Sequence, residues 1–109
     1  MLPRQHRLNG AAWRHLPTGG RRLVRPTVQV RHFPATDKRA AVVVSRKVST
    51  KAVVRNRLRR VLYGALENVW LDLPSGYYVV YVQPAAKQMG DVVARGELQD
   101  LLGEIIKAR

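Results

Sequence analysis

The sequence predicts an α+β fold, a small two-layer sandwich in which helices pack against a central sheet in the order helix, strand, strand, helix, strand, helix. Three observations support this prediction. Two long stretches repeat apolar residues with the period of a helix, shorter stretches alternate or are rich in β-branched residues, and Pro and Gly separate them. With 109 residues, 46% of them hydrophobic, the chain suits a single domain, residues 1–109, around one core.

The first predicted helix follows a basic arm. Residues 1–8 form this arm, which can be flexible. Asn9 supplies the N-cap of a short helix over residues 10–16, and Pro17 with the glycines after it ends that helix.

Three stretches have the pattern of strands. Residues 21–33 alternate, with Val28 and Val30 pointing to one side. Residues 39–47 follow a turn and are predicted to return as the second strand of an antiparallel hairpin. Residues 77–83 are aromatic and β-branched and end before a proline. The predicted sheet can also include one extra short strand.

Two stretches have the pattern of amphipathic helices. In residues 51–70 one apolar stripe comprises Val54, Leu58, Val61, Leu62, Ala65, Leu66 and Val69. The opposite side carries Arg55, Asn56, Arg59 and Arg60. The last helix, residues 91–107, has as its expected buried side Val93, Leu98, Leu101, Leu102, Ile105 and Ile106.

The formal net charge of +13 is unevenly distributed. Residues 1–60 hold sixteen of the twenty Lys and Arg residues but one of the seven acidic residues. Such an excess attracts a polyanion, because neutralised phosphates release condensed counterions. Fifteen of the twenty are Arg, whose guanidinium grips phosphate with two hydrogen bonds and stacks on bases, which favours nucleic acid over an anionic membrane.

Composition also excludes several classes of protein. The chain has no cysteine, so it has no disulfide, thiolate metal site or cysteine nucleophile. No apolar run reaches the roughly 18 residues of a membrane span, and the N-terminus lacks the apolar stretch of a signal peptide. We therefore expect a cytoplasmic protein with no membrane partner.

Catalytic side chains are scarce. His6, His15 and His32 offer a base and an acid for a metal-independent nuclease, but all three sit among arginines, where phosphate contact is the simpler role. Three acidic residues, Glu97, Asp100 and Glu104, recur at helical spacing. This spacing suits a metal cluster, and it equally suits a solvated helix face. Nucleotide-binding, hydrolase and zinc-peptidase motifs are absent. We expect no catalytic residue, no metal site and no small-molecule ligand on the protein.

Candidate binding residues gather at the start of the long helix and in the loop before it. They are Arg46, Lys47, Lys51, Arg55, Asn56, Arg57, Arg59 and Arg60. A single exposed arginine commonly serves solubility alone. Like charges one turn apart, such as Arg55 and Arg59, however, destabilise a helix by roughly 0.2 to 0.5 kcal/mol per pair. A bound phosphate backbone would make the contribution of these charges to the free energy favourable. Asn56 can donate to a phosphate or 2′-hydroxyl, or accept from an arginine and fix its direction.

The stretch SRKVSTKAVVRNRLRRVL, residues 45–62, resembles the signature of the bacterial ribonuclease P protein component. The resemblance extends over the chain, because the basic arm, the short helix, the strand pair, the GYYVVYV strand and the closing helix come in the family's order. It implies the ribonuclease P protein fold, including a left-handed β-α-β crossover.

The resemblance also implies a function. A protein of this family is the RNA-binding cofactor of a catalytic RNA that removes the 5′ leader from precursor tRNA, with Mg²⁺ held by the RNA. The implied partners are that RNA and precursor tRNA. The implied contacts to the catalytic RNA are Arg55, Asn56, Arg59 and Arg60, continued by Arg46, Lys47 and Lys51.

In the family, a cleft between the first helix and the sheet receives the single-stranded leader. Trp13, Val28 and Val30 are the candidates to line it here, with plain core packing as their alternative role. Two other functions remain open. A ribosomal or other structural RNA-binding protein would share the charge and size, and a stand-alone nuclease would depend on His15 or His32.

Overall fold

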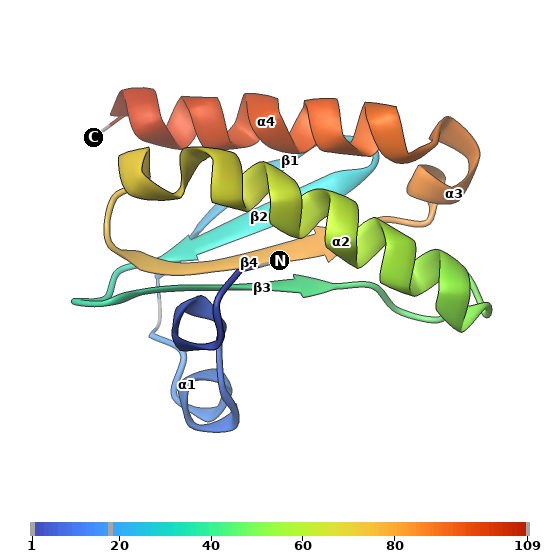
Figure 1. The fold of residues 1–109 in the computed structure, drawn as a ribbon. Helices are drawn as coiled ribbons and strands as arrows, with labels where there is room; N and C mark the ends of the chain where they lie inside the picture. The colour runs from blue at the N-terminus through green and yellow to red at the C-terminus, as the bar shows by residue number, and fades with distance from the viewer. Residues whose placement is uncertain (1, 18, 109) are drawn as a thin grey trace.

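The computed structural model describes residues 2–17 and 19–108. The strands are β1 (Arg21–Val24), β2 (Val28–Phe33), β3 (Lys38–Val43) and β4 (Gly76–Val82). The α-helices are α1 (Gly10–Arg14), α2 (Ala52–Val69), α3 (Ala85–Met89) and α4 (Asp91–Ala108), and the short 3-10 helices are η1 (Arg4–His6) and η2 (Trp70–Asp72). The predicted α+β class is confirmed, with β1 and α3 added to the expected order (Figure 1).

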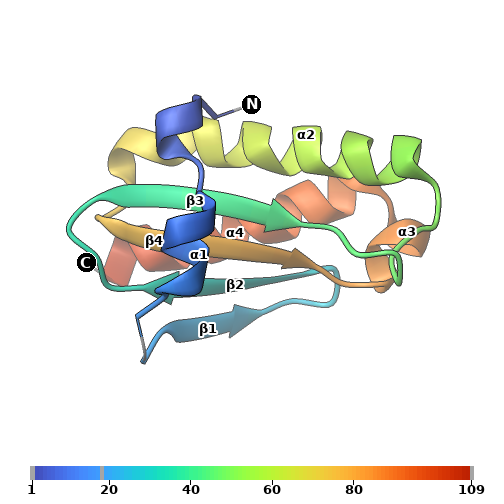
Figure 2. The ribbon, with the colours of Figure 1, turned by 90° about the horizontal axis from the view of Figure 1, so that it is seen from below.

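The strands form one sheet in the order β1-β2-β4-β3. Helices α2 and α4 lie side by side over one face of this sheet (Figure 1). Helix α1 crosses the other face and covers only part of it (Figure 2). The sheet therefore has one face closed by helices and one face that is open beside α1.

The predicted antiparallel hairpin between residues 21–33 and 39–47 is wrong. Strand β3 pairs in parallel with β4, which lies between β2 and β3 and is antiparallel to β2. Within β4, Val79 and Val80 point to opposite faces, and both are 0% exposed. The strand with apolar residues on both faces thus takes an interior place in the sheet. Alternation identifies a strand but not its neighbours.

Helix α2 connects β3 to the adjacent parallel strand β4. In Figure 2 both strands run to the right and β4 lies below β3, while α2 lies along the top of the view; Figure 1 shows that α2 is on the face that α4 also covers, which is the far face in Figure 2. This connection is left-handed, as the family resemblance implies. About 98% of such connections are right-handed, so the general preference of twisted strands does not set the hand here.

Residues 21–33 form two strands instead of one. Strand β1 is antiparallel to β2, with Leu23 opposite Val30. The turn between them closes with a hydrogen bond of 2.8 Å from Arg25 N–H to Val28 O. Strand β1 is the extra short strand for which the sequence left room.

The core lies between the sheet and the two long helices. The predicted stripe of α2 is confirmed at four positions that are at most 1% exposed, Leu58, Leu62, Ala65 and Leu66. On α4 the prediction for Val93 is wrong, because that side chain is 37% exposed whereas Ala94 is 0% exposed. The buried face of α4 follows helical spacing from Ala94 through Leu98, Leu101, Leu102 and Ile105, and Val93 lies one position off it. Within residues 2–17 and 19–108, no helix has the length and hydropathy to cross a membrane.

The N-terminal arm lies along the edge of β3. Leu8 N–H donates to Ala40 O over 3.0 Å, and Leu2 is 3% exposed. The predicted cap of α1 is confirmed, because Asn9 Oδ1 accepts from Ala12 N–H at 2.8 Å. These contacts fix where α1 crosses the open face of the sheet.

Glycine is required at the start of β4. Gly76 has a φ of +134°, and a Cβ there would lie 2.5 Å from Phe33 O and 2.6 Å from His32 Nε2. Its N–H donates to Asp37 O at 2.8 Å, which ties the start of β4 to the turn before β3. A side chain at this position would push β4 away from β2.

Candidate nucleic-acid interface

The predicted binding residues of α2 and of the loop before it lie together at one end of the molecule, where the chain passes from β3 into α2 (Figure 1). We call this surface the basic face; it comprises Arg46, Lys47, Lys51, Arg55, Asn56, Arg57, Arg59 and Arg60. Arg55 and Arg59 are partly buried and the other six are exposed. The helix therefore buries its apolar stripe and presents its cations to solvent, as its sequence pattern predicts.

The loop before α2 is held by its own buried residues. Val48 and Ser49 are 2% and 4% exposed, and Val48 N–H donates to Ser45 O at 3.1 Å. Ser49 O in turn accepts from Arg55 Nη1 at 3.0 Å. Arg55 thus fastens the first turns of α2 to the loop and keeps its remaining guanidinium donors for a ligand.

Asn56 orients a neighbouring arginine. Its Oδ1 accepts a hydrogen bond of 2.7 Å from Arg59 Nη2, one turn further along α2. The expectation that Asn56 accepts from an arginine is confirmed. The amide holds the guanidinium without neutralising it, so the positive charge remains available to an anion.

One cation of the basic face has an acidic partner. Arg57 Nε lies 2.8 Å from Asp91 Oδ2, at the start of α4. In the part of the chain that the structure describes, no carboxylate lies within 4.0 Å of the other cations, Arg46, Lys47, Lys51, Arg55, Arg59 and Arg60. Most of the positive charge of this surface is therefore left for a polyanion.

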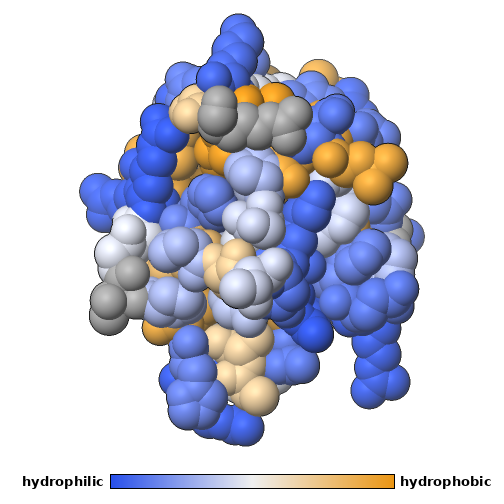
Figure 3. Space-filling view, turned by 90° about the vertical axis from the view of Figure 1, so that its left-hand side faces the viewer, coloured by the Kyte–Doolittle hydropathy of each residue, from blue (hydrophilic) through white to orange (hydrophobic). Residues whose placement is uncertain are grey.

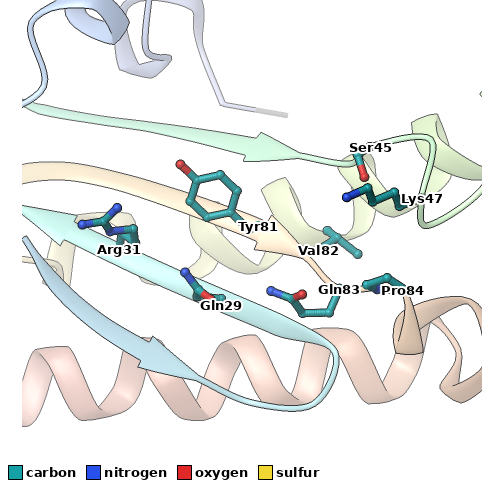
Figure 4. Close-up of a pocket in the computed structure, with 8 residues that line it drawn as sticks. All are labelled: Gln29, Arg31, Ser45, Lys47, Tyr81, Val82, Gln83 and Pro84. Carbon is teal, nitrogen blue, oxygen red and sulfur yellow. The ribbon is translucent and has the colours of Figure 1, made fainter.

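The open face of the sheet carries a second candidate site. Pairing between strands places Gln29 beside Tyr81 and Arg31 beside Val79 on this face. A hollow of about 310 Å³ opens here, and we call it the sheet groove (Figure 4). It is lined by Gln29, Arg31, Ser45, Lys47, Tyr81, Val82, Gln83 and Pro84.

The chemistry of the sheet groove suits an unpaired nucleotide. Tyr81 offers a partly exposed aromatic ring, and two glutamine amides offer donors and acceptors. The Arg31 guanidinium carbon lies 5.1 Å from the centre of the Phe33 ring, which holds the cation over this face of the sheet. Stacking, base-edge contacts and phosphate contacts are thus all available within one hollow.

The candidates proposed for a leader cleft divide between the two faces of the sheet. Val28 and Val30 are wrong, since both are 0% exposed and belong to the core beneath α2 and α4. Trp13 lies on the open side, where it packs with the cluster around Val79. Strand alternation does not show which face is covered by helices, and in the structure Gln29 and Arg31, not the valines between them, face the open side.

A sequence signal for the missed residues exists. Gln29 and Arg31 are the polar members of the alternation in β2, and Tyr81, one of three tyrosines in β4, lies opposite Gln29. Polar and aromatic side chains of this kind can bind RNA through hydrogen bonds and stacking, which valine side chains cannot provide.

The histidines are not assembled into a catalytic pair. His32 stacks on Tyr78 with ring centroids 4.4 Å apart, whereas His6 lies 5.1 Å from the ring of Trp70. His15 is exposed just after α1. Burial lowers the pKa of His32 below its usual value of 6.5, with a smaller lowering by Arg21. Each histidine therefore has its own surroundings, and the described contacts join no two of them.

Of the three carboxylates whose spacing suited a metal cluster, Glu97 and Glu104 serve the fold. Glu97 Oε1 accepts from Thr27 N–H at 2.9 Å and also from the Thr27 hydroxyl, and Glu104 pairs with Arg25 at 2.9 Å. They fasten the turn between β1 and β2 to α4. Among residues 2–17 and 19–108 no group of three His, Asp or Glu side chains is placed to hold a metal ion.

The end of the molecule formed by the C-terminal ends of α2 and α4 has a different surface. Figure 3 shows hydrophobic patches among hydrophilic residues there. Leu71 in η2 is 92% exposed. This end has neither the ordered arginines of the basic face nor the polar lining of the sheet groove.

Known proteins of similar sequence belong to one family. The ribonuclease P family profile matches residues 2–106. The ribonuclease P protein component of Coprothermobacter proteolyticus is 38% identical over 77 residues, covering 71% of this chain and 64% of that protein. The same component of Synechococcus sp. strain RCC307 is 32% identical over 107 residues, covering 84% of each. The chain spans 64% of the length of the Coprothermobacter relative and of that from Xylella fastidiosa strain Temecula1.

Solved structures agree with the fold. The ribonuclease P protein of Staphylococcus aureus superimposes with a TM-score of 0.77 at 19% identity, covering 97% of this chain and 93% of that one. The protein of Thermotoga maritima superimposes with a TM-score of 0.69 at 25% identity, covering 79% and 84%. The arrangement of sheet and helices described above is thus shared with these proteins.

Proposed function

Because the chain belongs to the ribonuclease P family, we propose that it is the protein subunit of a ribonuclease P ribonucleoprotein. It binds the catalytic RNA subunit and assists that RNA in the endonucleolytic removal of the 5′ leader from precursor tRNA. Its place of action is the cytoplasm. The RNA subunit, with bound Mg²⁺, supplies the hydrolysis.

The basic face carries this proposal. Six of its cations have no carboxylate within 4.0 Å in the part of the chain that the structure describes, and Asn56 orients Arg59 without neutralising it. A folded RNA offers phosphates at a spacing that several guanidinium groups on one helix can contact together. The like-charge repulsion along α2 then becomes favourable in the complex.

The sheet groove is the proposed site of the single-stranded leader. Tyr81 is positioned to stack on an unpaired base, and Arg31 to contact the adjoining phosphate. Trp13 borders the same face from α1. Val28 and Val30 do not contact the leader in this proposal. They pack in the core and hold β2 against the helices.

Reconstitution of the holoenzyme tests the proposal. Purified protein is mixed with a ribonuclease P catalytic RNA and precursor tRNA over a range of Mg²⁺ concentrations. We expect the protein to bind the RNA and to lower the Mg²⁺ concentration needed for cleavage, because its cations replace part of the counterion atmosphere. If the protein neither binds this RNA nor changes the Mg²⁺ requirement, and instead co-sediments with ribosomal particles, the proposal is wrong.

Two matched substitutions test the sheet groove. Tyr81→Ala is expected to weaken binding of precursor tRNA by the holoenzyme, since loss of one stacked base costs about 1 to 3 kcal/mol. Val24→Ala serves as the control, because Val24 is on the same face of the sheet in β1 but does not line the groove. Both variants should bind mature tRNA, which lacks a leader, as the wild type does. An equal effect of both variants would place the leader elsewhere.

A further inference from the structure

One acidic residue lies in the basic half of the chain. Asp37 is the only Asp or Glu among residues 1–60, and it precedes β3. A carboxylate in this half of the chain opposes the binding of a polyanion. Its contact in the structure shows what it contributes instead, because Asp37 Oδ2 accepts a hydrogen bond of 2.8 Å from Arg39 Nε and the two side chains form an ion pair.

Arg39 joins the turn before β3 to the N-terminal arm. Its Nη1 donates to Arg7 O over 3.3 Å. Beside this contact the two backbones also meet, since Leu8 N–H donates to Ala40 O at 3.0 Å. Arg39 therefore uses two sides of its guanidinium, one on the Asp37 carboxylate and one on the backbone of the arm. We call these two contacts of Arg39 the arm latch.

Helix α1 follows directly on the arm. Asn9 is its N-cap and comes one residue after Leu8. None of the five residues Gly10–Arg14 of α1, all of which the structure describes, is buried. The helix contacts the sheet through the partly buried Ala12 and Trp13. Because so short a helix is not stable by itself, its place on the open face depends on the arm that leads into it (Figure 2).

The position of α1 affects the aromatic side chains of the open face. Trp13 and Tyr81 belong to one apolar cluster with Leu8, the last residue of the arm. Tyr81 also lines the sheet groove. A shift of the arm would thus disturb the cluster in which the aromatic ring of the groove is packed.

We propose that Arg39 is a positioning residue for the binding of precursor tRNA: together with Asp37 it fixes the N-terminal arm and so holds α1 and Tyr81 in the arrangement that receives an unpaired base. This inference rests on the proposed function. Arg39 acts through the arm and does not contact the RNA. A site that is already ordered loses less conformational entropy on binding, so the arm latch contributes to substrate affinity and leaves the hydrolytic step to the catalytic RNA.

Arg25 offers a matched control for Arg39. Its Nη2 pairs with Glu104 at 2.9 Å, and its Nη1 donates to the backbone oxygen of Val24 at 3.1 Å. The Arg25 side chain is 33% exposed and that of Arg39 is 27% exposed. Arg25→Ala and Arg39→Ala therefore remove the same charge and the same kinds of contact, but only Arg39→Ala opens the arm latch.

The free protein tests the structural half of the inference. Because the chain has no cysteine, spin labels attach only at engineered positions. Ala11 in α1 and Gln99 in α4 are both exposed, and the two helices lie on opposite faces of the sheet. In the Ala11→Cys, Gln99→Cys protein we expect Arg39→Ala to broaden or shift the distance distribution measured by pulsed EPR. Arg25→Ala should leave that distribution unchanged.

The reconstituted holoenzyme tests the functional half. KM and kcat are measured for precursor tRNA, and Kd is measured for mature tRNA and for the catalytic RNA. Arg39→Ala should raise KM by about five-fold, the lower end of the range for one stacked base, with kcat unchanged. Both Kd values should stay at those of the wild type, and so should the slope of log K against log salt for precursor tRNA, since Arg39 contacts no phosphate. Arg25→Ala should match the wild type throughout.

Four results would overturn the inference. If Arg39→Ala changes neither the label distances nor KM, the arm is held without Arg39. If the distances change and KM does not, the position of α1 does not govern substrate binding. If KM rises and the salt slope falls, Arg39 contacts the RNA directly. If Arg25→Ala has the same effects as Arg39→Ala, the cause is lost charge or stability.

Failure of the proposed function gives a different result from failure of the arm latch. If the wild type binds no catalytic RNA, the proposed function fails and the positioning role fails with it. If the wild type binds the catalytic RNA and cleaves precursor tRNA while Arg39→Ala behaves as the wild type does, only the positioning role is wrong.

Discussion

Asn56 and Arg59 are joined on the exposed side of α2 by a hydrogen bond of 2.7 Å from Arg59 Nη2 to Asn56 Oδ1. The bond restricts a long side chain that would otherwise lose rotamer freedom on binding. It uses a neutral acceptor, so the guanidinium keeps its full charge.

The first prediction concerns this pair. Asn56→Ala should raise the Kd for the catalytic RNA by roughly five-fold, corresponding to about 1 kcal/mol for one hydrogen bond. Asn56→Asp keeps an acceptor for Arg59 but adds a negative charge to the basic face, so it should bind RNA more weakly than Asn56→Ala. Filter binding at fixed salt measures both. If Asn56→Asp binds as well as the wild type, orientation rather than charge decides affinity and the argument about the neutral amide is wrong.

A second prediction separates two arginines. Arg59→Ala should lower the slope of log K against log salt by about 0.9, one contact with a duplex. Arg57→Ala should lower it less, because Asp91 already neutralises part of the Arg57 charge at 2.8 Å. Conversely, Asp91→Asn should steepen the slope, since it releases Arg57. Equal slopes for the two arginine variants would show that the ion pair opens in the complex.

The third prediction concerns stability. Leu62→Ala should lower the free energy of unfolding by roughly 2 to 5 kcal/mol, because Leu62 is 0% exposed in the core. Leu71→Ala is the control; Leu71 is 92% exposed, and its change should stay within about 0.5 kcal/mol. Urea unfolding followed by circular dichroism measures both. A large loss at Leu71 would mean that the apolar patch near η2 is covered in solution.

The fourth prediction concerns pH. Burial lowers the pKa of His32 below 6.5, partly opposed by its contact with Ser75 O. The unfolded chain therefore binds the His32 proton more readily than the folded chain does. The stability that neutral His32 contributes is complete above pH 6.5 and is lost as the pH falls through the lower folded-state pKa.

His32→Phe tests this dependence because it keeps an aromatic ring beside Tyr78 and removes the titrating group. The free energy of unfolding should fall less between pH 7.5 and pH 5 in this variant than in the wild type. An NMR titration of the wild type should give a His32 pKa below 6.5. A pKa above that value would reverse the predicted sign.

The long helix and its two faces could be predicted from local sequence alone. Leu58 and Leu62 recur at helical spacing, and Arg55, Asn56 and Arg59 occupy the other side of the same repeat. The structure keeps this division, with Leu58 at 1% exposed and Asn56 at the surface. Helical periodicity depends on residues within a few positions of one another, so no distant segment is needed to specify it.

The sheet was harder to predict, because strand alternation has no preferred face and no preferred neighbour. Val28 and Val30 could point toward the helices or toward α1, and a shift of one residue exchanges the two faces. Tertiary packing determines which face is buried. Helices α2 and α4 cover the face that carries Val30 and Val80, so Gln29 and Tyr81 lie on the opposite face.

The excess of positive charge and the residues of the basic face could be predicted from the sequence by itself, because net charge and helical period are properties of composition and of neighbouring residues. The tertiary structure alone decided that β4 lies between β2 and β3, that Gln29, Arg31 and Tyr81 line the groove, and that Arg39 contacts the N-terminal arm. Each of these depends on contacts between segments that are far apart in the chain, and the free energy of those contacts is determined by the packing of the whole core.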